Sequence, residues 1–250
     1  MDLQLEGKRA LVTGGSRGIG KAIARVLACE GAQVAIAARD PARLAAAAGE
    51  ISAAAGTEVA TVQYEAGDDE SARNMVASAA EALAGIDILV NNAAQPGGTA
   101  PPNLGAVTTT DFSTDMNVKV MGYLRCAQHA APLMAANHWG RIINIGGLTA
   151  YTTVSMLSSM RVIAVASLTK NLADQLGPSG ITVNLVHPGS TRTERTTDEQ
   201  AARAGRNVIG RMVDAEEVAW LVAFLSSPRS GSITGESIGC GGGIPGTIRY

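Results

Sequence analysis

The sequence predicts an α/β protein built as a single-domain, Rossmann-type, doubly wound parallel sheet with helices on both faces. Short apolar runs alternate with longer segments of helical periodicity, which is typical of βαβ units. The apolar runs are continuous, as strands buried on both faces require, and this excludes an exposed antiparallel meander. No linker, composition shift or long-period repeat divides the 250 residues, so we expect one domain over 1–250.

The predicted elements follow one another in a regular order. The apolar runs that predict strands are 10–14, 34–38, 87–91, 141–145 and 181–186. The segments that predict helices are 20–31, 41–56, 72–85 and 160–177. The helix at 41–56 is rich in alanine, the best helix former, and we interpret it as a surface helix.

The segment 190–212 is the least regular part of the chain. Glycine, threonine and charges of both signs interrupt any period, so we expect a mobile loop with a short helix on the substrate side of the site. Its arginines alternate with acidic residues, which favours a solvated loop over an anion site.

The composition excludes several classes of partner. The chain has 46% hydrophobic residues, a formal net charge of -2 and no run of basic residues, so nucleic acid is not an expected partner. No segment approaches the roughly 20 apolar residues of a membrane span, and the N-terminus lacks the apolar stretch of a signal peptide. We therefore expect no membrane partner and a cytoplasmic location.

The three cysteines are Cys29, Cys126 and Cys240. Their number is odd, they lie far apart, and they lack the paired spacing of metal ligands. They predict neither a disulfide framework nor a zinc site, and we expect no metal. We interpret all three as thiols in or near the core.

A glycine-rich loop follows the first predicted strand. Gly14, Gly18 and Gly20 lie between this strand and the first helix, where glycine allows a tight turn and brings backbone N–H groups close to a pyrophosphate. A second apolar strand follows the helix, which is the context that makes the pattern specific. The loop therefore predicts a dinucleotide site.

The end of the second strand indicates which dinucleotide is bound. An acidic residue at this position would accept hydrogen bonds from the adenosine ribose and select NAD, but Ala38 stands there. Arg39 follows it, and Arg17 lies in the glycine loop, so two guanidinium groups flank the expected position of a 2′-phosphate. The sequence favours NADP(H) over NAD(H).

These motifs resemble the short-chain dehydrogenase/reductase (SDR) family. The resemblance rests on "TGGSRGIG" at 13–20, "NNAA" at 91–94 and "ITVNLVHPGSTRT" at 181–193. It continues through 210–243, which is similar to that family's last helix and last strand. The similarity covers nearly the whole chain and implies a homotetramer or a homodimer.

The resemblance implies a role for several individual residues. Ser16, Arg17 and Ile19 would line the phosphates, and Glu65 and Ala66 would flank the adenine. Asn92 and Ala93 would run along the ribose on the nicotinamide side. The residues that would hold the carboxamide end are Pro188, Gly189, Thr191 and Thr193.

The family moves a proton with a tyrosine, and a lysine four residues later on the same helical face lowers the tyrosine pKa. A serine upstream orients the substrate oxygen, and an asparagine on an earlier helix holds a chain of water molecules. Asn117 matches this asparagine, although its distance in sequence from the following "AAPLM" is slightly longer than usual.

The tyrosine, lysine and serine have no match. Aligned on 167–173, Ser158 and Val162 stand at the tyrosine and lysine positions, whereas counting from the preceding strand gives Met160 and Ala164. Gly146 or Gly147 replaces the serine in either alignment.

A check that needs no alignment leads to the same conclusion. The four tyrosines are Tyr64, Tyr123, Tyr151 and Tyr250, and none is followed four residues later by lysine. The sequence lacks the Tyr-x-x-x-Lys pair.

Three other residues are candidates for the proton-transfer chemistry. Tyr151 follows the fourth predicted strand and borders the expected pocket, His187 precedes "PG" near the nicotinamide end, and Ser158 supplies a hydroxyl. Each also has a purely structural interpretation: Tyr151 as a pocket wall, His187 as a hydrogen-bonded residue at a strand end, and Ser158 as a hydroxyl without an activating base.

The sequence leaves three hypotheses about function. The first is an NADP(H)-dependent oxidoreductase acting on a small-molecule carbonyl or alcohol, with a proton route through Asn117, water and Tyr151 or through the substrate itself. The second is a non-catalytic NADP(H)-binding sensor, or a partner subunit in a hetero-oligomer with an active homologue. The third is a lyase or isomerase without redox chemistry.

Overall fold

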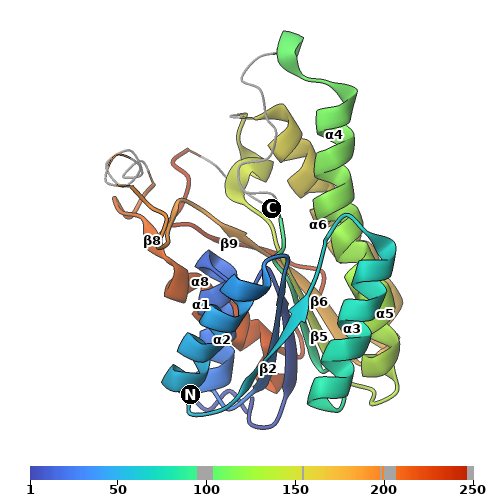
Figure 1. Cartoon of the computed structure of the whole chain (residues 1–250). Helices are drawn as coiled ribbons and strands as arrows, with labels where there is room; N and C mark the ends of the chain where they lie inside the picture. The colour runs from blue at the N-terminus through green and yellow to red at the C-terminus, as the bar shows by residue number, and fades with distance from the viewer. Residues whose placement is uncertain (95–103, 154, 198, 200–206, 247–250) are drawn as a thin grey trace.

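The computed structural model describes residues 1–94, 104–153, 155–197, 199 and 207–246, and it confirms the predicted fold class (Figure 1). Seven parallel strands form one sheet in the order β3-β2-β1-β4-β5-β6-β9. The strands are β1 (Arg9–Thr13), β2 (Gln33–Ala38), β3 (Val59–Gln63), β4 (Ile88–Asn91), β5 (Gly140–Ile145), β6 (Ile181–Pro188) and β9 (Ser237–Cys240). A small parallel pair joins β7 (Thr191–Arg192) to β8 (Val213–Asp214).

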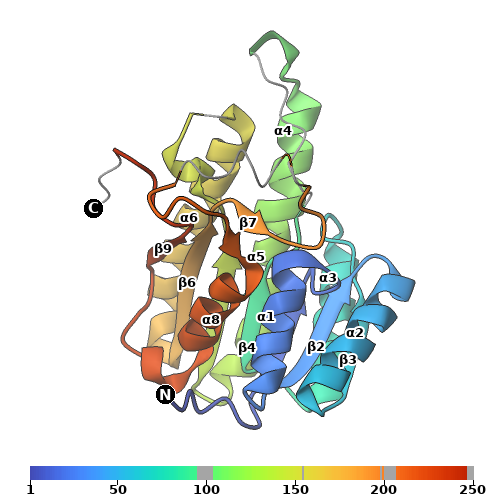
Figure 2. The ribbon, with the colours of Figure 1, turned by 90° about the vertical axis from the view of Figure 1, so that its left-hand side faces the viewer.

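Helices cover both faces of the sheet (Figure 2). The helices are α1 (Gly18–Cys29), α2 (Pro41–Ala55), α3 (Asp69–Leu83), α4 (Thr109–Asp115), α5 (Gly122–Ala135), α6 (Met156–Leu176) and α8 (Ala215–Ser226). The short turns are η1 (Leu104–Ala106), the π-helical η2 (Met116–Met121), η3 (Leu148–Tyr151), η4 (Gly177–Ser179) and η5 (Pro228–Ser230). Helices α1, α2 and α8 pack on one face, and α3, α5 and α6 pack on the other.

Local sequence signals set the ends of several helices. The Asp40 side chain accepts hydrogen bonds from the backbone N–H groups of Ala42 and Arg43, so it caps α2, and Pro41 takes the first helical position. Gly56 ends the helix with φ of +71°, a left-handed conformation that glycine adopts without strain. The alanine-rich segment is therefore helical as predicted.

Several features differ from the sequence predictions, and α5 is not among the predicted helices. Strand β3 is not among the predicted strands, because as an edge strand it is buried on one side only and its apolar pattern is weak. Cys126 is buried and Cys240 is half-buried, but Cys29 is exposed at the last residue of α1, so its assignment to the core was wrong.

The predicted mobile segment 190–212 is only partly described. Residues 198 and 200–206 lie outside the described residues, so the expected mobile loop and short helix are not tested there. The described part contains β7, whose Thr191 and Arg192 pair with Val213 and Asp214 of β8. Within the described residues, no helix is both long and apolar enough to cross a membrane.

The chain reverses its direction of winding between β1 and β4. Strands β2 and β3 lie on one side of β1, and β4, β5, β6 and β9 lie on the other, which places a ligand crevice above the ends of β1 and β4. The buried Thr13 hydroxyl accepts hydrogen bonds from the N–H groups of Asn92 (2.9 Å) and Ala93 (3.0 Å). One side chain therefore joins the strand ends that form the floor of the crevice.

We expect Thr13→Val to lower the free energy of unfolding by roughly 2–4 kcal/mol, because it leaves two backbone N–H groups without their acceptor. Urea denaturation followed by circular dichroism measures this loss. Thr13→Ser is the matched control, since it keeps the hydroxyl. Equal stability of Thr13→Val and Thr13→Ser would contradict the assignment.

Candidate functional site

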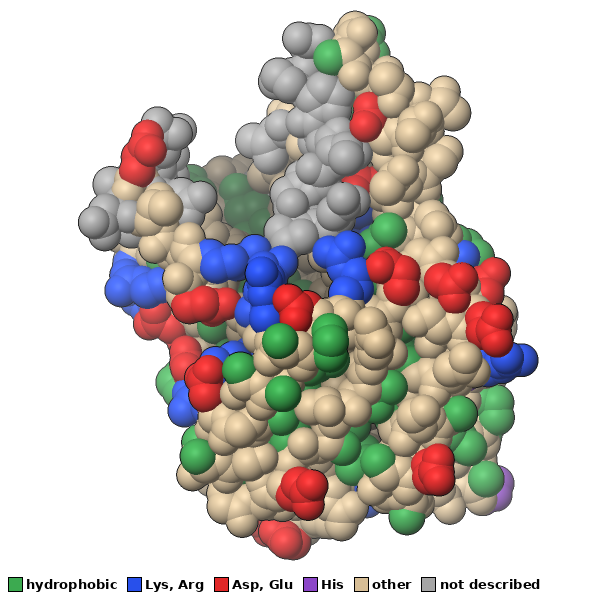
Figure 3. All heavy atoms as spheres, in the orientation of Figure 1, with side chains coloured by type: hydrophobic (Ala, Val, Ile, Leu, Met, Phe, Trp, Pro, Cys, Tyr) green, Lys and Arg blue, Asp and Glu red, His purple; other side chains and the backbone are tan. Residues whose placement is uncertain are grey.

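A cleft of about 1490 Å³ opens at the carboxyl ends of the strands. Figure 3 shows Lys and Arg side chains gathered at its lower rim. Every cofactor residue that the sequence predicts, except Gly20, lines this cleft. These are Gly14, Ser16, Arg17, Gly18, Ile19, Arg39, Glu65, Ala66, Asn92, Ala93, Pro188, Gly189, Thr191 and Thr193.

The glycine loop approaches its neighbours too closely for a side chain. Gly14 has φ of +67°, and a Cβ there would lie 2.7 Å from the Asn92 amide nitrogen. A Cβ on Gly20 would lie 2.3 Å from the Gly14 carbonyl oxygen. Gly20 is buried and serves the packing of α1 against the loop, which explains why it does not line the cleft.

A carboxylate already occupies the anion position at the start of α1. The Gly18 N–H donates to both carboxylate oxygens of Glu194, at 3.0 and 3.2 Å. Because backbone N–H groups and the helix dipole favour negative charge here, Glu194 stands in for an anion such as a pyrophosphate oxygen. The glycine loop therefore fits the phosphates of a dinucleotide.

Four arginines surround the outer end of the cleft. Arg17, Arg39, Arg43 and Arg195 all line it. The pKa of Arg17 is lowered, first by partial burial and then by the charges of Arg195 and Arg43. The carboxylate partner of Arg39 among the described residues is Glu65, at a distance of 3.9 Å. The positive charges of these arginines repel one another, and a bound phosphate group would reduce this repulsion.

The two alignments of α6 differ in which residues line the inner end of the cleft. Ser158 and Val162 are buried and line the cleft, whereas Met160 is 48% exposed and Ala164 is not a lining residue. The alignment that places Ser158 and Val162 at the tyrosine and lysine positions is therefore the one with the matching geometry. The Ser158 hydroxyl lies 2.9 Å from that of Thr149, another lining residue.

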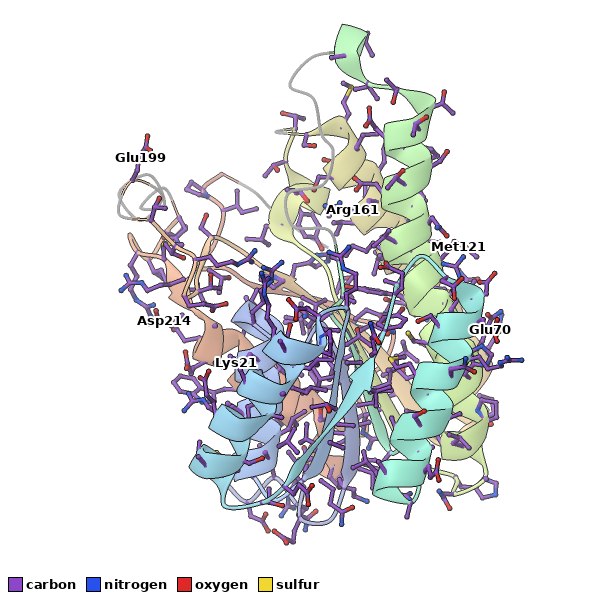
Figure 4. The ribbon with its side chains drawn as sticks, viewed as in Figure 1. Lys21, Glu70, Met121, Arg161, Glu199 and Asp214 are labelled. Carbon is purple, nitrogen blue, oxygen red and sulfur yellow. The ribbon has the colours of Figure 1, made fainter. Side chains whose placement is uncertain are left out.

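A buried ion pair joins α6 to α4 behind these hydroxyls. The Arg161 guanidinium lies 3.0 Å from the Asp115 carboxylate, with side-chain exposures of 9% and 2%. Arg161 also donates to the Ser158 hydroxyl at 3.2 Å and lines the cleft. Figure 4 shows Arg161 near the start of α6, beside the continuous helical segment formed by α4, η2 and α5.

Lys119 is the second cation at this end of the cleft. It projects from the π-helical turn η2, is 6% exposed, and its ammonium donates to the Gly146 carbonyl at 3.2 Å. Burial first, and then the charge of the neighbouring Arg161, lower the pKa of Lys119 to about 7, against the opposing charge of Asp115. This amine can exchange a proton near neutral pH.

Asn117 does not face the cleft. Its amide nitrogen donates to the Gly67 carbonyl at 3.0 Å, and its amide oxygen accepts from Arg125 at 2.8 Å. These contacts tie η2 to the segment before α3, so Asn117 and Ser158 are not brought together. The π-turn also explains the long spacing noted in the sequence, because its i→i+5 bonding accommodates an extra residue.

Tyr151 and His187 pack against each other behind the wall of the cleft. Their ring centroids lie 5.2 Å apart in an edge-to-face arrangement. His187 is fully buried, its Nδ1 lies within hydrogen-bond distance of the backbone N–H and carbonyl of Gly147, and neither residue lines the cleft. The catalytic roles suggested for Asn117, Tyr151, Ser158 and His187 stay predictions, and Ser158 alone among them lines the cleft.

The two glycines at the end of β5 differ in the space around them. A Cβ on Gly146 would lie 2.7 Å from the His187 ring, so a serine does not fit there without a shift. A Cβ on Gly147 would lie 3.7 Å from the Thr149 hydroxyl and 4.0 Å from Val162, both ordinary contacts. Gly147 therefore has room for a side chain, and the Thr149 hydroxyl lies beside it.

The sequence predictions missed three polar residues of the inner cleft: Thr149, Arg161 and Lys119. On an ordinary α-helix, Lys119 and Asn117 are separated by about 200° and point to opposite faces. An Asn117 side chain that faced the site would therefore have placed the Lys119 side chain on the opposite face of an α-helix, and for this reason Lys119 was not predicted. In the described part of the chain, no cluster of His, Cys, Asp and Glu has the makings of a metal site.

Comparison with known proteins places the chain among reductases. Residues 14–245 match the family model described as enoyl-(acyl carrier protein) reductase. The 3-oxoacyl-(acyl-carrier-protein) reductase FabG of Aquifex aeolicus is 34% identical over 250 residues, covering 98% of this chain and 100% of the relative.

Solved structures agree with this placement. A short chain dehydrogenase from Burkholderia cenocepacia J2315, determined in complex with NADP, is 39% identical with a TM-score of 0.87, covering 96% of this chain and 98% of that one. A dehydrogenase/reductase from Sinorhizobium meliloti 1021 is 38% identical with a TM-score of 0.88, covering 97% and 98%.

We expect Glu194→Gln to tighten binding of NADPH, the cofactor that the sequence predicts, by about fivefold. The substitution removes a negative charge that competes with phosphate at Gly18, and a charge-assisted bond replaced by a neutral one is worth roughly 1 kcal/mol. NADPH fluorescence titration measures the dissociation constant, with Glu81→Gln on the exposed face of α3 as control. An unchanged or weaker affinity would argue against this competition.

Proposed function

The chain belongs to the short-chain dehydrogenase/reductase family, and from this premise we propose that it is an NADP(H)-dependent oxidoreductase acting on a carbonyl or alcohol. We further propose that its proton route does not use the family's Tyr-x-x-x-Lys pair. The observation that carries the proposal is the cleft itself, where the glycine loop, the ends of the strands and a hydroxyl pair line one continuous space.

The preference for NADP(H) rests on the outer end of the cleft. Arg39 follows Ala38 at the end of β2, and Arg17 and Arg43 face the same space, so a 2′-phosphate would meet several guanidinium groups and no acidic residue at the strand tip. The Burkholderia relative, whose structure contains NADP, supports the same choice.

Residues of the cleft would bind the cofactor and orient the substrate. The backbone around Gly14 to Gly18 would hold the pyrophosphate, and Asn92, whose amide nitrogen donates to the Thr13 and Gly14 carbonyls, fixes the loop beneath it. A reduced nicotinamide, when bound, supplies a hydride. The Ser158 and Thr149 hydroxyls lie at the inner end, where they would orient a substrate oxygen.

A non-catalytic NADP(H)-binding protein is the second candidate. Val162 and Ser158 at the pair's positions favour it, since neither supplies a cation or an acid of suitable pKa. Such a chain would bind NADPH without turnover, as a sensor or as a partner subunit of an active homologue. Chemistry without redox change would require neither NADPH oxidation nor NADP+ reduction.

We also propose that the protein is a homo-oligomer and that it is located in the cytoplasm. Helices α5 and α6 and the turn η2 carry large apolar side chains that are partly exposed in the single chain: Met121 at 41%, Leu133 at 37% and Ile163 at 54%. These side chains support assembly through these helices, into a dimer or a tetramer. Light scattering after size-exclusion chromatography measures the mass.

We expect the protein to bind NADPH and to oxidise it with a member of a panel of ketones, aldehydes and 3-oxoacyl thioesters. Isothermal titration with NADPH and NADH measures binding, and absorbance of the reduced nicotinamide measures turnover. Binding without turnover across the panel supports the non-catalytic alternative, and absence of binding contradicts both proposals.

We expect Ala38→Asp to weaken NADPH binding by tenfold or more and to leave the dissociation constant of NADH unchanged or lower. A carboxylate at the end of β2 repels the 2′-phosphate and accepts hydrogen bonds from a ribose that lacks it. Arg39→Ala should weaken NADPH binding alone, by about 10-fold to 100-fold. Arg73→Ala on α3 is the control, and equal losses for NADPH and NADH would contradict the assignment of the phosphate site.

A further inference from the structure

We propose that Lys119 donates the proton to the substrate oxygen during carbonyl reduction, while the hydroxyls of Ser158 and Thr149 position that oxygen. This inference rests on the proposed oxidoreductase function. It assigns the proton route to a residue on η2, in place of the pair that α6 lacks.

The position of Lys119 carries the first step of the argument. The cleft is lined at its outer end by arginines, Asp40 and Glu65, and at its inner end by Lys119, Arg161, Thr149 and Ser158. A guanidinium is not a proton donor for catalysis in proteins, and the hydroxyls lack an adjacent base among the described residues. Among the described residues at the inner end, Lys119 is therefore the group whose proton can leave.

The surroundings of Lys119 carry the second step. The ammonium is buried, donates to the Gly146 carbonyl at 3.2 Å and has no carboxylate within salt-bridge distance among the described residues. The nearest carboxylate, Asp115, is already paired with Arg161 at 3.0 Å. A buried cation without a partner of its own is costly, which favours the neutral amine.

The charged and titratable groups near Lys119, among the described residues, come from several different elements. Arg161 from α6 disfavours the ammonium, and Asp115 from α4 favours it. The Tyr123 ring from α5 lies 5.7 Å from the ammonium, and burial raises the pKa of Tyr123 above its usual range, so this phenol stays neutral. His187 lies behind Gly146 and Gly147 from β6, with its Nδ1 at their backbone.

The π-turn is the structural reason that Lys119 faces the cleft. With Asn117 tied to Gly67 and Arg125 on the opposite side, the wider turn directs Lys119 toward Gly146. Turns of this kind are rare and occur often at functional sites. The Arg161–Asp115 pair next to it holds Ser158 through a hydrogen bond from the guanidinium.

The chemical step balances. A reduced nicotinamide, when bound, would supply the hydride to the carbonyl carbon, and the Lys119 ammonium would give its proton to the carbonyl oxygen. The products are an alcohol, the oxidised cofactor and a neutral Lys119 amine, which regains a proton from water. In the reverse direction the neutral amine accepts the proton of the alcohol.

The test compares Lys119→Met, Lys119→Arg and the wild-type protein. Both variants should lose 10²-fold to 10⁴-fold in kcat for carbonyl reduction, while the dissociation constant of NADPH changes by less than about threefold. Lys119→Arg keeps the positive charge but cannot release the proton, so it separates charge from proton transfer. Lys170→Met, at an exposed lysine of α6, is the control and should keep wild-type kcat.

The proposal also predicts how kcat changes with pH. Because the donor must be protonated, wild-type kcat for reduction should fall as pH rises through about 7, and kcat for alcohol oxidation should rise over the same range. Both inflections should disappear in Lys119→Met. Melting temperatures of the variants confirm that they fold.

A second readout needs no turnover. Competitive acylation of the cofactor-free protein at a series of pH values, quantified by peptide mass spectrometry, should give Lys119 a midpoint near 7, far below the ordinary value of a lysine side chain. A Lys119 midpoint above 9, or a kcat within threefold of wild type in both Lys119 variants, would overturn the inference while leaving the oxidoreductase proposal intact. A wild-type protein that reduces no carbonyl would overturn both.

Discussion

The junction between the ends of β1 and β4 is the constraint on which the rest of the molecule depends. In a parallel sheet that winds both ways, these two strands diverge into helices on opposite faces, and the crevice lies where they part. The buried Thr13 hydroxyl holds the two ends together through backbone N–H groups of Asn92 and Ala93. The glycine loop, the start of α1 and the floor of the cleft all rest on this junction.

Charge is distributed so that the two ends of the cleft perform different tasks. The outer end carries solvated arginines around a space where a backbone N–H group points at a carboxylate, an arrangement suited to binding phosphate groups. Among the described residues, the inner end carries the buried amine of Lys119 and the buried guanidinium of Arg161, with the buried Asp115 carboxylate beside them. Burial beside Arg161 lowers the pKa of Lys119, so its proton is labile near neutral pH.

The sequence predicted most of the fold and the cofactor half of the site from local patterns. Continuous apolar runs marked the central strands, and glycines between a strand and a helix marked the loop that approaches the cleft. Strand β3 was not predicted, because an edge strand buries one side only and its apolar pattern is weak. At the reaction end, residue spacing assigned Asn117 to the site, but its side chain bonds Gly67 and Arg125 instead.

The sequence by itself determined the fold class, the position of the dinucleotide loop and the lack of a Tyr-x-x-x-Lys pair, because each depends on residues close together along the chain. Only the tertiary structure decided which polar groups meet at the inner end of the cleft. Lys119, Thr149 and Arg161 come from three separate elements, and a π-turn sets the direction of Lys119. Its pKa near 7 follows from burial beside Arg161, which no local pattern encodes.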